Sequence, residues 1–277
     1  MHCLLPFSVR IGPGPGFEPG SGDPQSPRMH RYPIPAMSPQ ILLGKNIYQR
    51  QASRKVPAGK AIFLDFSNTI TTVESENKSM SLWLDLIVNE YRLKEDIRRN
   101  FAKARMEKLV DRETRFRSFM QINHEVLSEL YGIAEIFEEE YYRSHERNLR
   151  LRPDFVDFIE EAKNDYEIVM VTDADNTYTE RTLSALGIDK YFDSIVTAEM
   201  VKSPKPDPRI FRAAMKEAHD PTKVVFIGDS ERRDIEGAKK MGFIALKMDD
   251  DSSSTVADMT IHNFRDASLK IKKLLLE

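Results

Sequence analysis

The stretch FLDFSNTI at 63–70 places an acid where it can act as a nucleophile. An apolar run delivers the Asp65 carboxylate to a short polar turn, so the acid stands at the end of a buried segment. A nucleophilic carboxylate of this kind often works with a second acid two residues later, which supplies and removes protons. Position 67 is a serine, whose hydroxyl does not do this near neutral pH. The turn therefore predicts a nucleophile without its usual acid/base partner.

Three more polar side chains lie at or just beyond the ends of apolar runs. Thr172 ends the run EIVMVT, Asp229 stands in KVVFIGDS, and Lys205 lies in the loop that follows DSIVTA. In open α/β sheets, ligands bind outside the carboxyl ends of the strands. Each residue alone has an ordinary explanation as a turn residue, a helix cap or a surface lysine. Because all of them follow strands in succession, we expect them to converge with Asp65 on one crevice.

The elements that must position these side chains alternate between short apolar runs and helical patterns. Continuous apolar runs are typical of strands buried on both faces of a parallel sheet. Strands are predicted at 61–66, 167–172, 193–198, 223–230 and 243–248. Helices are predicted at 176–188, 207–219, 231–243 and 263–276. This alternation predicts an α/β fold with a Rossmann-like parallel-sheet core.

A long helical segment interrupts the predicted core between its first and second strands. We expect residues 58–76 and 149–277 to form the α/β core domain and residues 77–148 to form a helical cap domain. The amphipathic patterns of the cap lie at 81–93, 94–110, 112–130 and 135–148. The charge runs on these helices are typical of solvated faces.

The first residues differ in composition from the rest of the chain. Nine of the fifteen prolines and five of the twelve glycines precede Ile41. Such a segment cannot bury enough apolar surface to offset the entropy of ordering. We therefore expect residues 1–55 to be disordered, or to be an extension upstream of a natural start at Met29 or Met37.

Composition excludes several classes of function. The 277 residues are 31% charged and 40% hydrophobic with a net charge of −3, which gives no reason to expect nucleic acid as a partner. No apolar run approaches the roughly 18 residues of a membrane-spanning helix, so we expect no membrane association. The single cysteine, Cys3, excludes an intrachain disulfide and a zinc site of several thiolates. A reducing, cytoplasmic location fits best.

Four motifs in this order resemble the haloacid dehalogenase-like (HAD) hydrolase superfamily. The first is an apolar strand that ends in Asp-x-Asp-x-Thr, and this chain has Asp65-Phe66-Ser67-Asn68-Thr69. The second is a strand that ends in Thr172, and the third is Lys205 within KPDPRIF. The fourth is Gly-Asp-Ser with a second acid downstream, here Asp229 and Asp234. The resemblance covers residues 60 to 248, and the helical insertion is placed like the cap that follows the first motif in many members.

The resemblance implies a Mg²⁺-dependent hydrolase of a small phosphorylated metabolite, with Asp65 forming an aspartyl-phosphate. A carboxylate that attacks a phosphate dianion needs a hard cation with oxygen ligands to neutralise charge. The implied metal ligands are Asp65, the Ser67 carbonyl, Asp229 and Asp234. The implied catalytic residues are Asp65, Thr172 and Lys205. The implied substrate-binding residues are Ser67, Asn68, Thr172, Asp173 and Lys205.

Ser67 departs from the family pattern and leaves three possibilities open. In the first, the leaving group needs no proton, as in a phosphonatase or a dehalogenase. In the second, another acid takes the place of the missing one. In the third, catalysis is lost and the protein only binds phosphate or a partner. Glu74, Glu76, His124 and His145 are the candidate substitutes. A phosphonatase would also need a cap lysine, for which Lys103 and Lys108 are the candidates. The retained acids Asp229 and Asp234 favour phosphorus chemistry over dehalogenation.

Overall fold

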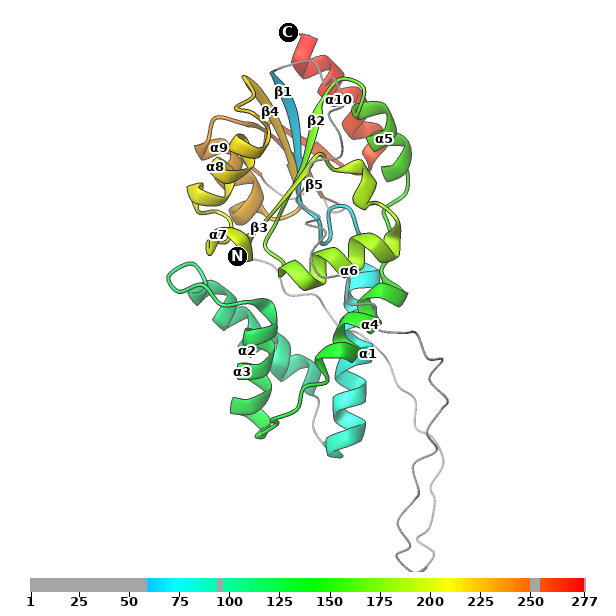
Figure 1. The fold of residues 1–277 in the computed structure, drawn as a ribbon, viewed down its shortest axis with the longest axis vertical. Helices are drawn as coiled ribbons and strands as arrows, with labels where there is room; N and C mark the ends of the chain where they lie inside the picture. Colours follow the sequence, from blue (N-terminus) through cyan, green and yellow to red (C-terminus); the bar gives the residue numbers. More distant parts are fainter. Residues whose placement is uncertain (1–58, 94–96, 250–254, 277) are drawn as a thin grey trace, which may run out of the picture. The chain divides into compact units, whose positions relative to one another are not determined.

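The computed structural model describes residues 59–93, 97–249 and 255–276, which all belong to one compact unit spanning Gly44–Glu277. The prediction about residues 1–55 lies outside the described residues. The predicted α/β fold is confirmed: six parallel strands form one sheet in the order β3-β2-β1-β4-β5-β6. The first strand in sequence, β1, therefore lies near the middle of the sheet, between β2 and β4 (Figure 1).

The strand predicted at 167–172 has these bounds, and the other four predicted strands are one or two residues shorter than predicted. The observed strands are β1 Lys60–Leu64, β2 Glu167–Thr172, β3 Ser194–Thr197, β4 Lys223–Gly228, β5 Ile244–Met248 and β6 Met259–Ile261. The sequence did not predict β6, because a three-residue strand carries too little pattern to recognise. Leu64 pairs with Met170 on one side and with Ile227 on the other. The carboxyl ends of β1, β2 and β4 thus meet at one edge of the sheet.

Both faces of the sheet are buried, as the continuous apolar runs predict. In β1, Ala61 and Phe63 pack into one apolar cluster, whereas Ile62 and Leu64 pack into the other. The first cluster is covered by α8 (Pro208–Glu217) and α9 (Glu236–Lys240), and the second by α5 (Phe155–Ala162) and α10 (Phe264–Leu276). The two helix layers are visible on either side of the sheet (Figure 1).

The inserted segment forms four helices. They are α1 Val73–Tyr91, α2 Ile97–Asp111, α3 Phe119–Tyr131 and α4 Glu138–Asn148. Their interior is organised round Trp83, whose indole Nε1 donates to the Ile136 carbonyl at 2.8 Å and whose ring meets Phe101 and Tyr141 edge-on. Helix α1 begins at Val73, inside the segment predicted as core, because the Thr72 side chain caps it.

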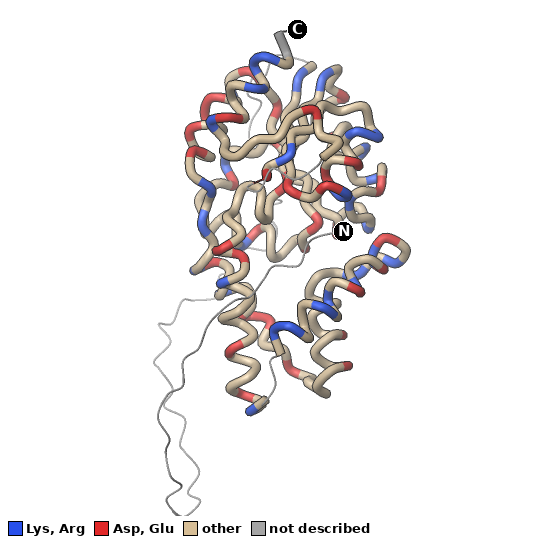
Figure 2. Tube along the Cα trace, turned by 180° about the vertical axis from the view of Figure 1, so that it is seen from behind, with Lys and Arg blue, Asp and Glu red and all other residues tan. Residues whose placement is uncertain are grey.

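The remaining core helices follow the strands. They are α6 Asn176–Leu186, α7 Ala198–Val201 and a short 3-10 turn at Asp189–Tyr191. The helix predicted at 231–243 is two elements: a π-helical turn at Glu231–Ile235 precedes α9. Acidic and basic positions are interspersed along the described helices (Figure 2). Among the described residues, no helix combines the length and the apolar composition that crossing a membrane requires.

Candidate active site

Asp65 is held at the carboxyl end of β1 with both carboxylate oxygens oriented. Its backbone amide donates to the Ile227 carbonyl at 2.9 Å, which extends the pairing with β4 by one residue. Oδ1 accepts from Lys205 Nζ at 2.5 Å, and Oδ2 accepts from Thr69 Oγ1 at 3.1 Å. The residue is only 7% exposed. The carboxylate is therefore fixed by a cation on one side and a hydroxyl on the other.

A tight turn after Asp65 brings the next residues back over the end of the strand. Asn68 has a φ of 64°, in the left-handed region that asparagine tolerates better than most residues. Its amide donates to Thr71 Oγ1 at 3.1 Å, and its carbonyl accepts from Arg152 Nε at 3.1 Å and Nη2 at 2.9 Å. These bonds fix the turn from both sides. Ser67 and Asn68 remain partly exposed there.

Lys205 is a buried cation with oxygen partners from three elements. Its Nζ lies 2.5 Å from Asp65 Oδ1, 2.6 Å from Asp234 Oδ1 and 3.0 Å from the Val171 carbonyl. Its backbone amide donates to Asp173 Oδ1 at 2.8 Å. Burial alone would lower the pKa of Lys205, but the carboxylates of Asp234 and Asp65 raise it overall. The ammonium is therefore a permanent positive charge beside Asp65.

Three carboxylates form a cluster that fits a divalent cation. One oxygen each from Asp65, Asp229 and Asp234 lies within 4.8 Å of the others. Burial raises the pKa of Asp65 to about 7 even though Lys205 opposes the shift, and the neighbouring carboxylates add to it. Burial and the Asp234 charge raise the pKa of Asp229 to about 6. Like charges crowded into a buried site are stabilised by a hard cation, and carboxylate oxygens are the ligands that Mg²⁺ prefers.

The position of Asp234 depends on the glycine at the end of β4. A Cβ built on Gly228 would lie 2.5 Å from both Cβ and Cγ of Asp234, so no larger residue fits without displacing the acid. Asp234 Oδ2 accepts from the Ser230 amide at 2.9 Å. The π-helical turn thus folds the Asp234 side chain back toward the strand end.

The segment after β2 contributes the remaining predicted residues. Thr172 is the last residue of the strand and is 2% exposed, and its Oγ1 accepts from the Ala174 amide at 3.2 Å. Asp173 binds the Lys205 amide with Oδ1, and its Oδ2 lies 3.6 Å from Arg233 Nη1. Its backbone carbonyl accepts from Arg112 Nη1 of the cap at 2.7 Å. This segment therefore contacts the loop that holds Lys205, the Arg233 side chain and Arg112 of the cap.

Of the four candidate substitute acids, the structure places Glu76 against Ser67. The Glu76 carboxyl lies close to the Ser67 side chain. It also accepts from Thr71 Oγ1 at 2.5 Å and from the Tyr178 hydroxyl at 3.2 Å. Burial raises the pKa of Glu76, although these hydroxyls oppose the shift. A carboxyl group thus lies beside the position that holds the second acid in the family pattern.

The other three candidates are placed differently. Glu74 is exposed in the first turn of α1. His124 is exposed, and its Nε2 lies 3.2 Å from the Ala134 carbonyl. His145 is buried with Nδ1 2.7 Å from the Tyr141 carbonyl, and burial lowers its pKa to about 4. A neutral imidazole bonded to its own helix is a part of the cap interior.

The two cap lysines have different surroundings. Lys103 is exposed on α2. Lys108 pairs with Glu129 at 2.8 Å and approaches Glu125 at 3.6 Å. Neither has a described contact with Asp65 or the other acids of the cluster.

Sequence reasoning missed two residues that contact the site. Thr69 Oγ1 lies 3.1 Å from Asp65 and 3.5 Å from Asp229 Oδ1, so it bridges the two acids. The sequence did carry a signal for Thr69, because it is the last residue of the first motif. Arg233 contacts Asp173 and is attracted by the acidic cluster. Nothing in the sequence distinguishes it from its neighbour Arg232.

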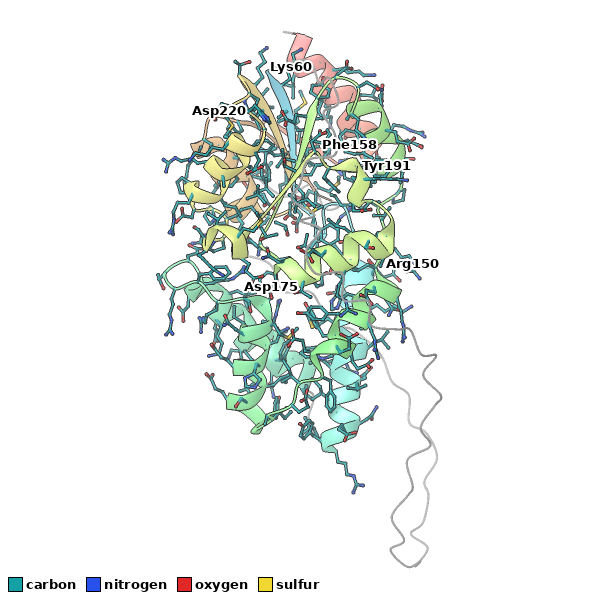
Figure 3. All side chains as sticks on the ribbon, in the orientation of Figure 1. Lys60, Arg150, Phe158, Asp175, Tyr191 and Asp220 are labelled. Carbon is teal, nitrogen blue, oxygen red and sulfur yellow. The ribbon has the colours of Figure 1, made fainter. Side chains whose placement is uncertain are left out.

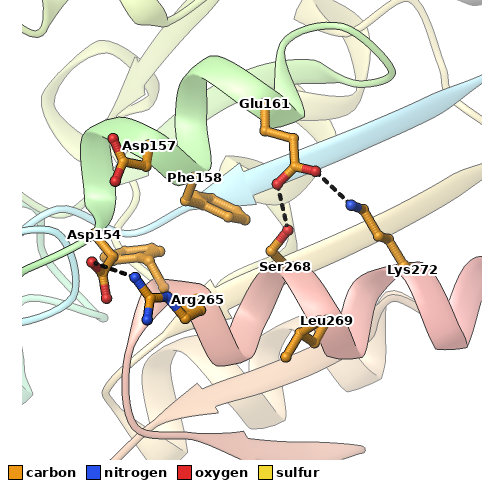
Figure 4. Close-up of a pocket in the computed structure, with 9 residues that line it drawn as sticks. Asp154, Asp157, Phe158, Glu161, Arg265, Ser268, Leu269 and Lys272 are labelled. Carbon is orange, nitrogen blue, oxygen red and sulfur yellow. Dashed lines mark hydrogen bonds and ion pairs between the residues drawn. The ribbon is translucent and has the colours of Figure 1, made fainter.

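A hollow of about 300 Å³ lies elsewhere, between α5 and α10 (Figure 4). Four of its five charged side chains pair within it. Glu161 accepts from Ser268 at 2.8 Å and from Lys272 at 2.5 Å, and Arg265 lies 3.7 Å from Asp154. It contains none of the residues at the strand ends, so it is not part of the candidate active site.

Comparison with known proteins identifies a family. A family model described as haloacid dehalogenase-like hydrolase matches residues 60–242. The mouse protein called haloacid dehalogenase-like hydrolase domain-containing protein 3 is 42% identical over 64 residues, which is 23% of this chain and 26% of that protein. The matched segment thus spans about a quarter of that relative's length.

Solved structures with different chemistry share the fold. The HAD phosphatase of Thermococcus onnurineus has a TM-score of 0.61 and 25% identity, covering 78% of this chain and 97% of that one. A 2-haloacid dehalogenase from Pseudomonas syringae pv. Tomato DC3000 has a TM-score of 0.61 and 20% identity, covering 78% and 99%. The fold alone therefore does not choose between phosphate esters and haloacids, and the choice must come from the site.

Proposed function

The chain belongs to the haloacid dehalogenase-like hydrolase family, and from this membership and its site geometry we propose that it hydrolyses a small phosphorylated metabolite through Asp65. The observation that carries the proposal is the trio of carboxylates from Asp65, Asp229 and Asp234 within 4.8 Å, joined to the buried Lys205. Attack on a haloacid carbon needs one carboxylate and does not need an acidic cluster that fits a divalent cation. The match to a HAD phosphatase at 25% identity points the same way.

Asp65 is the proposed nucleophile. One of its carboxylate oxygens forms a bond to phosphorus as the bond from phosphorus to the leaving oxygen breaks, which gives an aspartyl-phosphate. Water then cleaves this acyl-phosphate, releases inorganic phosphate and restores the carboxylate. Lys205 and Thr69 hold the two oxygens of Asp65 in fixed directions, so little reorganisation precedes the attack.

The other site residues bind and neutralise the phosphoryl group. Lys205 supplies a point charge, and we assign the Thr172 hydroxyl and the Asp173 amide as donors to phosphoryl oxygens. Ser67 and Asn68 line the same turn. The proposed Mg²⁺ ligands are the carboxylates of the cluster and the Ser67 carbonyl. When bound, Mg²⁺ supplies the positive charge that lets an anion approach a phosphate dianion.

The serine at position 67 limits which leaving groups are handled well. Without a positioned acid at this point, an alkoxide must leave with less help, and this costs about 10²–10⁴ in rate. The proposed activity is therefore greatest on phosphates with good leaving groups, such as acyl phosphates. The alternatives, a phosphonatase, a dehalogenase or a protein that binds phosphate without turnover, are outcomes of the same experiment.

The test compares acetyl phosphate, an aryl phosphate, an alkyl phosphate, an alkyl phosphonate with a β-carbonyl, and 2-chloropropionate. Each is assayed with Mg²⁺ and with a chelator, for the wild type and Asp65→Asn. Release of phosphate from acetyl phosphate or a phosphate ester that requires Mg²⁺ and is lost in Asp65→Asn supports the proposal. Phosphate released from the phosphonate alone would identify a phosphonatase and contradict it. Chloride release that persists in the chelator, or phosphate release that persists in Asp65→Asn, contradicts it.

A further inference from the structure

Arg105 on α2 is a recessed cation without a matching anion. Its Nε donates to Asn123 Oδ1 at 2.9 Å, and its guanidinium lies 5.1 Å from the centre of the Phe119 ring. Among the described residues, no carboxylate lies within ion-pair distance of it. The side chain is partly exposed, yet burial is the main influence on its pKa and lowers it. Its two Nη atoms have no hydrogen-bond partner among the described residues, and they lie in a position largely enclosed by protein.

Neighbouring cations do have partners, which makes Arg105 the exception. Arg112 donates to the Asp173 carbonyl at 2.7 Å, and its Nη2 lies 3.8 Å from Asp175 Oδ1. Arg233 lies 3.6 Å from Asp173. The Asp175 carboxylate is already occupied, because it accepts from two backbone amides at the start of α3 (its position beside the cap is labelled in Figure 3). The like charges of Arg112, Arg233 and Arg105 disfavour one another.

A series of neighbouring side chains connects Arg105 to the turn that follows Asp65. Asn123 is fully buried, and its Nδ2 has no hydrogen-bond partner of normal geometry among the described residues, although it approaches the Tyr141 hydroxyl. The Tyr141 ring is 6.0 Å from the ring of Tyr178, whose hydroxyl lies near Ser67. Arg105 is thus connected, through these buried side chains, to the residues beside Asp65.

We propose that Arg105, oriented by Asn123, binds a second anionic group of the substrate, while the phosphoryl group reacts at Asp65. The substrate class is then a phosphate carrying a carboxylate or a second phosphate at its other end. A planar guanidinium with two free nitrogens suits either group, because both present a pair of oxygens. The proposal rests on the proposed function for its substrate class, but the site itself can be tested by binding alone.

The turnover test uses phosphates of increasing chain length that end in a carboxylate, a second phosphate or a methyl group. Arg105→Gln is compared with Arg99→Gln, a matched removal of one guanidinium from an exposed position on the same helix. We expect wild type to favour an anionic terminus at one length. Arg105→Gln should lower that preference, measured as a ratio of kcat/KM values, about 10- to 100-fold, as expected for a lost charge-assisted hydrogen bond. Arg105→Lys should keep part of it, and Arg99→Gln all of it.

A binding test keeps the inference separate from the proposed function. Calorimetry with Mg²⁺-loaded protein compares ω-carboxylated alkyl phosphonates with plain alkyl phosphonates, none of which needs to be hydrolysed. If no phosphate ester is hydrolysed but Arg105→Gln still loses the preference for the carboxylated phosphonate, the proposed function fails and this inference stands. If wild type shows no preference at any length, or if Arg105→Gln and Arg105→Lys melt like wild type and keep it, the inference is wrong.

Discussion

Ser67→Asp is the substitution that most directly tests the chemistry of this site. It restores the second acid of the Asp-x-Asp pattern in a position that is partly exposed and close to Glu76. The new carboxyl would share the hydroxyl of Tyr178 with Glu76. Two neighbouring carboxyls that share one hydroxyl do not both ionise easily, so one of them holds a proton near neutral pH. The variant therefore gains a group that can protonate a leaving oxygen.

The size of the gain depends on the leaving group. A positioned general acid is worth about 10²–10⁴ in rate, or roughly 3–5 kcal/mol of barrier. We expect a gain in kcat/KM of this order for an alkyl phosphate, a smaller gain for an aryl phosphate and almost none for acetyl phosphate. A plot of log kcat/KM against the pKa of the leaving group should be steep for wild type and flatter for Ser67→Asp.

The control is Ser67→Asn, which has the same shape as the aspartate without its proton. If Ser67→Asn accelerates alkyl phosphate turnover as much as Ser67→Asp, the gain comes from packing and the reasoning is refuted. If wild type is already fast on alkyl phosphates and Ser67→Asp adds nothing, another group has been supplying protons. Glu76 would be the first to examine, by Glu76→Gln, because it is the acid in contact with Ser67.

Three other predictions follow from the buried charges. The raised pKa of about 7 means that folded, metal-free protein keeps a proton on Asp65 that the unfolded chain loses above the ordinary pKa of 3.8. Stability should thus fall as pH rises from about 4 to 7, and Mg²⁺ should raise the melting temperature more at pH 8 than at pH 5. Gly228→Ala, which drives a methyl group into Asp234, should destabilise the protein by about 1–3 kcal/mol in urea and raise the Mg²⁺ concentration needed for half-maximal turnover. Lys205→Met leaves Asp65 and Asp234 buried without their cation, and should cost about 3–5 kcal/mol of metal-free stability and abolish turnover. Unchanged unfolding curves would contradict the predictions for Gly228→Ala and Lys205→Met.

The convergence of these side chains could be predicted from the sequence, because it follows from the positions of strand ends. Asp65, Thr172 and Asp229 each follow an apolar run, and parallel strands bring such positions to one edge whatever the intervening chain does. The approach of Lys205 to Asp65 was also implied by the motif. The short strand β6, the helix α5 and the π-helical turn that orients Asp234 were not predicted, since each occupies too few residues to show a period.

The lining of the cap could not be predicted for a different physical reason. Helix α2 has only Ile97 and Phe101 fully buried, so its polar residues do not fall on one recognisable face. Arg105 therefore looks in sequence like Arg99, and only packing distinguishes a recessed guanidinium from a solvated one. The same holds for Glu76, which lies against Ser67 because α1 begins earlier than its apolar pattern suggests.

The segment after β2 links the proposed phosphoryl site to the proposed second anion site. Asp173 binds the lysine loop through its side chain and the cap through its carbonyl, which accepts from Arg112. Asp175, two residues on, caps α3 by accepting from the Phe119 amide at 2.7 Å. Because Phe119 also lies beneath the Arg105 guanidinium, the residues that receive the phosphoryl group and the cation proposed for the other end of the substrate are fixed by one short stretch of backbone. A substrate that fits both ends is then selected by its length as well as its charge, since neither end can shift without breaking these bonds.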